Sequence, residues 1–92
     1  MKRFTVVCHR TVEDQLGELI LAHWGTPLME QVTSAANRID AELAMRADEA
    51  GTKIETGLRT LVVYPLAVEF EVNTDDRMVT ILGYELARVD SP

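Results

Sequence analysis

Residues 66–73 read Leu-Ala-Val-Glu-Phe-Glu-Val-Asn, a strict alternation of large apolar residues with small or polar ones. Successive side chains of a strand point to opposite faces of a sheet, so this alternation predicts a strand with one buried and one exposed face. A register shift of one residue would bury Glu69 and Glu71 without partners. Other parts of the chain must therefore cover the apolar face.

Strands are also predicted on both sides of this segment. Residues 58–63 are rich in residues that favour strands, and they end at Tyr64-Pro65, where a proline without an N–H group indicates a tight turn. Residues 77–86 follow a polar turn and form a long final strand. A fourth, short strand is expected at residues 3–9, near the start of the chain.

Two helices are predicted between the first strand and residue 58, because apolar residues recur there at spacings of three and four. The first helix has Thr11 as its expected N-cap, and the second begins at Pro27 and runs to about residue 46. Gly25 marks the corner between them. Residues 47–57 are polar, contain two glycines and lack periodicity, so they are predicted to form a loop.

These elements give the order β-α-α-β-β-β in a single domain spanning residues 1–92. A chain of this length can bury one sheet with helices on one side and little more. The expected fold class is therefore α+β, with a helical hairpin packed on one face of a four-stranded, mainly antiparallel sheet.

The charge balance restricts the partners. The chain carries 9 Lys+Arg against 15 Asp+Glu, a formal net charge of -6. Strong nucleic-acid binding needs clustered cations, so it is not expected here. No apolar run approaches the roughly 20 residues of a membrane span, and the start has too short an apolar stretch for a signal peptide. The sequence thus predicts a cytoplasmic protein without membrane contact.

No residue set indicates a metal or cofactor. Cys8 is the single cysteine and cannot form an intramolecular disulfide. His9 and His23 lie on different predicted elements without a partnering cysteine or histidine motif. The expectation is that the protein uses neither a metal ion nor a cofactor.

Residues 57–72 and 77–82 carry a family resemblance. They read Gly-Leu-Arg, an apolar strand, a turn, a strand ending Phe-Glu-Val, and, after an acidic turn, a second apolar strand. This pattern, with the order of elements, resembles the RelE/ParE superfamily of type II toxin–antitoxin toxins, of which this chain would be a diverged member. The resemblance covers most of the chain and implies the RelE/ParE fold.

The resemblance also suggests where catalytic residues would lie. Family nucleases place basic residues on the sheet face away from the helices, with a Tyr or His near the C-terminus for proton transfer. Arg59 and Arg88 match basic positions, Tyr84 is a further candidate, and Ala67 stands where nucleases have an arginine. Each candidate has a structural alternative: an ion pair with Glu69 for Arg59, a solvated terminal charge for Arg88, and packing for Tyr84.

The resemblance therefore implies a toxin of the plasmid-stabilisation type that acts by binding an antitoxin protein or peptide, with a cellular target as a further partner and most nuclease residues missing. Two alternatives stay open: a ribosome-dependent endoribonuclease with an unconventional site, and a non-toxic interaction or assembly protein. Because the chain is acidic, the expected partner carries Lys or Arg along its polar side, with a homodimer as the substitute.

Overall fold

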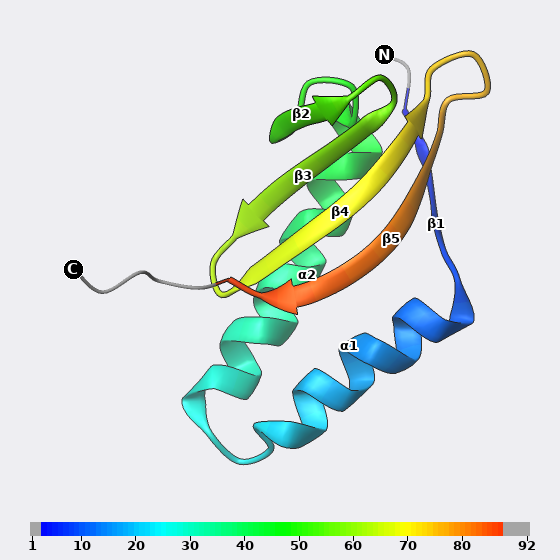
Figure 1. Cartoon of the computed structure of the whole chain (residues 1–92). Coiled ribbons are helices and arrows are strands. Elements are labelled where there is room, and N and C mark those ends of the chain that lie inside the picture. The colour runs from blue at the N-terminus through cyan, green and yellow to red at the C-terminus, as the bar shows by residue number, and fades with distance from the viewer. Residues whose placement is uncertain (1–2, 88–92) are drawn as a thin grey trace.

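Two helices pack on one face of a five-stranded sheet in the computed structural model, which describes residues 3–87 (Figure 1). The elements, in chain order, are β1 Thr5–Cys8, α1 Arg10–Ala22, α2 Pro27–Arg46, β2 Thr52–Glu55, β3 Leu58–Val63, β4 Leu66–Asn73 and β5 Met78–Leu86. The α+β class and the helical hairpin are confirmed. The four-strand sheet and the order β-α-α-β-β-β are wrong, because a further strand precedes β3.

The strands are ordered β1-β5-β4-β3-β2 across the sheet. β1 pairs with β5 in parallel, and every other neighbouring pair is antiparallel, as expected for a mainly antiparallel sheet. The chain enters the sheet at one edge, crosses the helical hairpin, and returns to the opposite edge. β5 then lies between β1 and β4.

β2 is the strand that was predicted as loop. It pairs with β3, with Thr52 opposite Thr60 and Lys53 opposite Arg59. All four of its residues are exposed. An edge strand that is solvated on both faces has no period-two pattern of apolar residues, and for that reason the sequence did not distinguish it from a loop.

α2 has the predicted bounds, with Pro27 as its first residue. One stripe of this helix is buried against the sheet: Val32, Ala35, Ala36, Ile39 and Leu43. α1 differs from its prediction because it begins at Arg10, with His9 in the N-cap position. The carbonyl of His9 accepts the N–H groups of Val12 (2.9 Å) and Glu13 (3.0 Å), so Thr11 lies inside the helix and the N-cap prediction is wrong.

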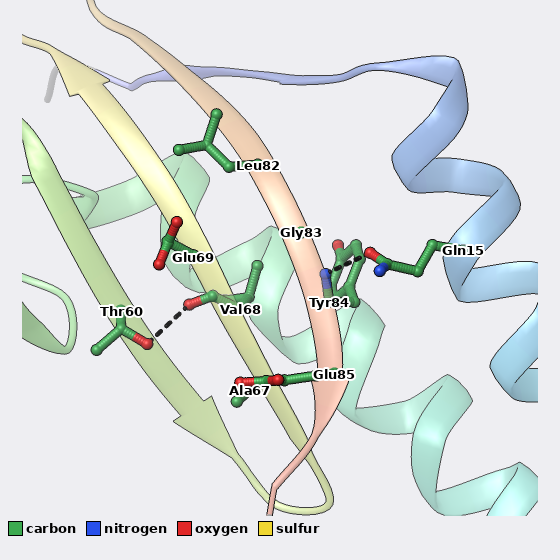
Figure 2. A pocket seen from close by; sticks show the side chains of 9 residues that line it. All are labelled: Gln15, Thr60, Ala67, Val68, Glu69, Leu82, Gly83, Tyr84 and Glu85. Atoms are coloured by element: carbon green, nitrogen blue, oxygen red, sulfur yellow. Dashed lines mark hydrogen bonds between the residues drawn. The ribbon is translucent and has the colours of Figure 1, made fainter.

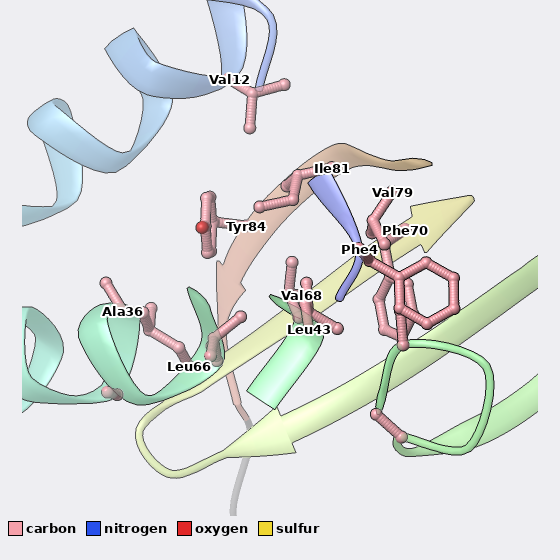
Figure 3. Close-up of a cluster of buried hydrophobic side chains, with 14 of the residues drawn as sticks. Phe4, Val12, Ala36, Leu43, Leu66, Val68, Phe70, Val79, Ile81 and Tyr84 are labelled. Carbon is pink, nitrogen blue, oxygen red and sulfur yellow. The ribbon is translucent and has the colours of Figure 1, made fainter. Parts of the chain in front are cut away.

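The core lies between the sheet and the helices and follows the alternation of β4 (Figure 3). Leu66, Val68 and Phe70 are buried there, whereas Glu69 and Glu71 are exposed on the opposite face. β5 adds Val79, Ile81 and Tyr84, and α2 adds the buried stripe of its inner side. The prediction that the helices cover the apolar face of β4 is confirmed.

The side of the sheet turned away from the helices is called the outer face below. It carries alternate residues of the three central strands: Leu58, Thr60 and Val62 of β3, Ala67, Glu69, Glu71 and Asn73 of β4, and Met78, Thr80, Leu82 and Glu85 of β5. On β5 the alternation is interrupted by a β-bulge. Glu69 faces Gly83 and Phe70 faces Ile81, so Leu82 is an extra residue in that strand.

Candidate functional site

The outer face contains a hollow of about 250 Å³ over β3, β4 and β5 (Figure 2). It is lined by Gln15, Thr60, Ala67, Val68, Glu69, Leu82, Gly83, Tyr84 and Glu85. The hollow exists because Ala67 and Gly83, in neighbouring strands, have almost no side chain, and the bulge at Leu82 bends β5 beside them.

Glu69 and Glu85 give this hollow its charge. In the register of β4 and β5, Glu69 faces Gly83 and Glu85 faces Ala67, so the two carboxylates are diagonal neighbours on one face. The Thr60 hydroxyl beside them donates to the carbonyl of Val68 at 3.2 Å. The lone pairs of the Thr60 hydroxyl oxygen can still accept hydrogen bonds from a ligand. The hollow therefore offers hydrogen-bond acceptors and negative charge.

A side chain from α1 closes one end of the hollow. β1 pairs with β5 only as far as Ile81, so the edge of β5 beyond that residue has no neighbouring strand on that side. The backbone N–H of Tyr84 there donates to Oε1 of Gln15 at 2.9 Å. Gln15 thus satisfies a backbone donor that a strand would otherwise pair.

The strands bring no cation to the outer face. Lys53 and Arg59 are the basic residues carried by the described strands, and they face each other across β2 and β3. Arg59 also lies opposite Phe70, which is buried on the helix side. Because directly opposed residues share a face, both cations lie on the helix side of the sheet.

Arg59, a candidate catalytic residue, binds backbone carbonyls instead of lying at the hollow. Its Nε–H donates to the carbonyl of Ala50 at 2.8 Å, and Nη2 donates to the carbonyl of Gly51 at 3.3 Å. The ion pair expected with Glu69 is not among the contacts of the described chain, because Glu69 lies on the other face. The structure gives Arg59 a role in holding the segment that joins α2 to β2.

Tyr84, the second candidate, is part of the core. Its side chain is buried, and it pairs with Val68, whose side chain is also buried on the helix side (Figure 3). Burial raises the pKa of the Tyr84 phenol, and the negative charges of Asp40 and Cys8 raise it further. A proton donor with these surroundings releases its proton poorly. Arg88, the third candidate, lies outside the described residues.

The remaining titratable residues do not form a second site. His9 and His23 stand at opposite ends of α1. Burial, together with Glu13 and Asp40, raises the pKa of the Cys8 thiol, which disfavours the reactive thiolate. Within residues 3–87, no group of three or more His, Cys, Asp or Glu side chains could hold a metal ion. No helix in the same range is both long and apolar enough to cross a membrane.

Comparison with known proteins bears on the fold. No family model matches the sequence, and no curated protein matches it significantly. A chain of the toxin–antitoxin complex RelBE2 from Mycobacterium tuberculosis matches with a TM-score of 0.73 and 16% identity, over 98% of this chain and 97% of that one. The chromosomal ParDE system from P. aeruginosa matches with a TM-score of 0.69 and 16% identity, over 96% and 100%. The chain has a RelE/ParE-like fold.

Within this RelE/ParE-like fold, the outer face departs from the nuclease pattern described above. Ala67 occupies the hollow at the position expected to carry an arginine, and carboxylates surround it. Glu69 and Ala67 could be assigned to this face from the alternation of β4 alone. Leu82, Gly83 and Glu85 were missed, although the loss of alternation at Leu82-Gly83 is the sequence signal of a bulge.

Proposed function

We propose that this chain is the toxin-like component of a type II toxin–antitoxin pair and that it acts by binding rather than by cutting RNA. The RelE/ParE-like fold supports the first part, since its structural neighbours come from toxin–antitoxin complexes. The charge of the outer face supports action by binding rather than by RNA cleavage. Its three central strands carry Glu69, Glu71 and Glu85 and no cation there.

A phosphorane transition state needs cations and a proton donor around it. At the hollow, phosphate would instead meet carboxylates, and like charges repel. Arg59 is engaged with carbonyls on the helix side, and the Tyr84 ring is in the core. The geometry therefore supports a protein partner over an RNA substrate. In this proposal the chain is a single domain acting in the cytoplasm, with an antitoxin protein or peptide as partner.

Two measurements test the proposal. The product of a short reading frame adjacent to the gene should co-purify with the chain as a stable complex, whereas the chain alone added to a translating extract should leave messenger RNA intact. A ribosome-dependent RelE-type nuclease serves as the positive control for cleavage. Codon-dependent cutting of message by the purified chain would overturn the binding-only activity, and the lack of any adjacent binding product would overturn the toxin–antitoxin role.

A further inference from the structure

The outer face exposes large apolar side chains to solvent, although the helices cover the other side of the sheet. Val62 is 59% exposed, Leu82 41% and Met78 40%. They come from β3 and β5 and lie on the same face as the hollow. Val62 and Leu82 lie beside the hollow, whereas Met78 lies opposite Asn73 at the other end of β5. An antiparallel sheet with one solvated face normally carries polar residues there, so the exposed apolar side chains beside the hollow favour a protein contact.

Three carboxylates lie among these apolar side chains. Glu69 and Glu71 are two residues apart on β4, and Glu85 is the diagonal neighbour of Glu69 on β5. Such diagonal neighbours are about 7–8 Å apart, which is comparable with the screening length of ~8 Å at physiological salt, so their charges still repel each other. Within residues 3–87, the ion pair that the structure shows joins Glu42 to Arg46 on α2, so none of the three carboxylates is paired with a described Lys or Arg. A cation supplied by a partner would relieve their mutual repulsion.

We infer that the outer face is the docking surface for a basic, amphipathic segment of a partner protein. An Arg or Lys side chain of that segment enters the hollow between Glu69 and Glu85, and apolar residues beside it cover Val62 and Leu82. This inference rests on the proposed function, because it assigns the surface through which a partner binds. The hollow, about 250 Å³, is smaller than the ~300–1,000 Å³ of small-molecule sites, and it suits one side chain of a larger ligand.

Charge complementarity selects this occupant over the others. A second copy of the chain would bring three carboxylates against three carboxylates, and a nucleic acid would bring phosphates. A guanidinium group instead presents several N–H donors in a planar fork, which can bond both carboxylates of the hollow. The acidic net charge of -6 favours the same partner at longer range.

The experiment selects binders to the purified chain from a displayed library of random 12-residue peptides. Selected peptides should be enriched in Arg or Lys next to apolar residues. The strongest binder is then measured by calorimetry against Glu69→Gln/Glu85→Gln, which keeps the shape of both side chains and removes their charges. Binding should weaken by about tenfold. The matched control, Glu18→Gln/Glu49→Gln, removes the same charge at exposed positions away from the outer face and should bind like the parent.

Failure of this inference differs from failure of the proposed function. Absence of binders, selected peptides without basic residues, or equal weakening by both double variants would each refute the docking surface. If an adjacent gene product binds the parent and Glu69→Gln/Glu85→Gln equally, the surface is wrong and the toxin–antitoxin role stands. If peptides depend on Glu69 and Glu85 but no adjacent product binds, the surface stands and the role is wrong.

Discussion

Arg59 ties the segment after α2 to β3 through two hydrogen bonds from one guanidinium group. Replacement by alanine removes both bonds and leaves the carbonyl of Ala50 without this donor. Arg59→Ala should therefore lower the free energy of unfolding by about 1.5–3 kcal/mol. Urea denaturation measures this value. The control is Lys53→Ala, on the exposed strand opposite, which should change stability by less than about 0.5 kcal/mol. Similar losses for both variants would contradict the role given to Arg59.

Tyr84 makes stability depend on alkaline pH. Burial raises its pKa above the ordinary phenol value of 10.0. The unfolded chain therefore releases this proton near pH 10.0, whereas the folded chain keeps it. Below pH 10.0 the free energy of unfolding does not depend on this group, and it declines as the pH rises through the folded pKa. Tyr84→Phe should reduce that decline in urea denaturation at increasing pH. Tyr64→Phe, at an exposed side chain, should retain it, and an unchanged decline in Tyr84→Phe would count against this assignment.

The turn into β2 depends on a glycine that packs against β3. Gly51 has φ +65°, and a Cβ atom there would lie 2.0 Å from the carbonyl oxygen of Thr60. Gly25 also has positive φ, +79°, but has no atom within 4 Å of that position. Gly25→Ala should lower the free energy of unfolding by about 1–2 kcal/mol, because it adds backbone strain alone. Gly51→Ala adds the clash with the backbone of Thr60 and should lower it by about 3 kcal/mol or more. Thermal unfolding of the two variants compares them, and equal losses would show that β2 moves freely away from β3.

Elements with one buried face could be predicted from the sequence, and elements without one could not. The alternation of β4 and the stripe of α2 report burial directly, and both have the predicted bounds. β2 has no buried face, and β3 has an apolar run, Leu61-Val62-Val63, that does not reveal which residues point inward. The orientation of Arg59 follows from pairing with Phe70, a long-range contact that local sequence does not contain.

At the scale of the whole molecule, the placement of charge matters more than its sum. Changing Glu69, Glu71 and Glu85 to Lys brings the formal net charge from -6 to about zero. This variant should bind single-stranded RNA at low salt, unlike the parent, and its affinity should fall about tenfold between ~50 and ~200 mM salt. The matched control changes Glu18, Glu30 and Glu49, which lie off the sheet, to Lys. Filter binding compares the two variants, and equal affinities would mean that net charge alone decides.

Local sequence patterns predicted only part of the candidate site. The pattern of β4 assigned Ala67 and Glu69 to the outer face, but the hollow needs three strands in register and a bulge on β5. Such a site is a property of the assembled sheet. The RelE/ParE-like fold supplies the frame, and the side chains on its outer face determine which class of partner that frame can bind.

The pairing of β1 with β5 also governs when the protein becomes complete during its synthesis. Residues 5–8 are translated first, but their sheet neighbours, residues 78–81, follow only after both helices and three other strands. Until then the hairpin lacks Val79 and Ile81 beneath it, and its apolar side stays open to chaperones and to misassociation. β5 also supplies four of the nine residues that line the hollow, Glu85 among them, so under the docking proposal a nascent chain has no complete partner surface before that strand is made and paired.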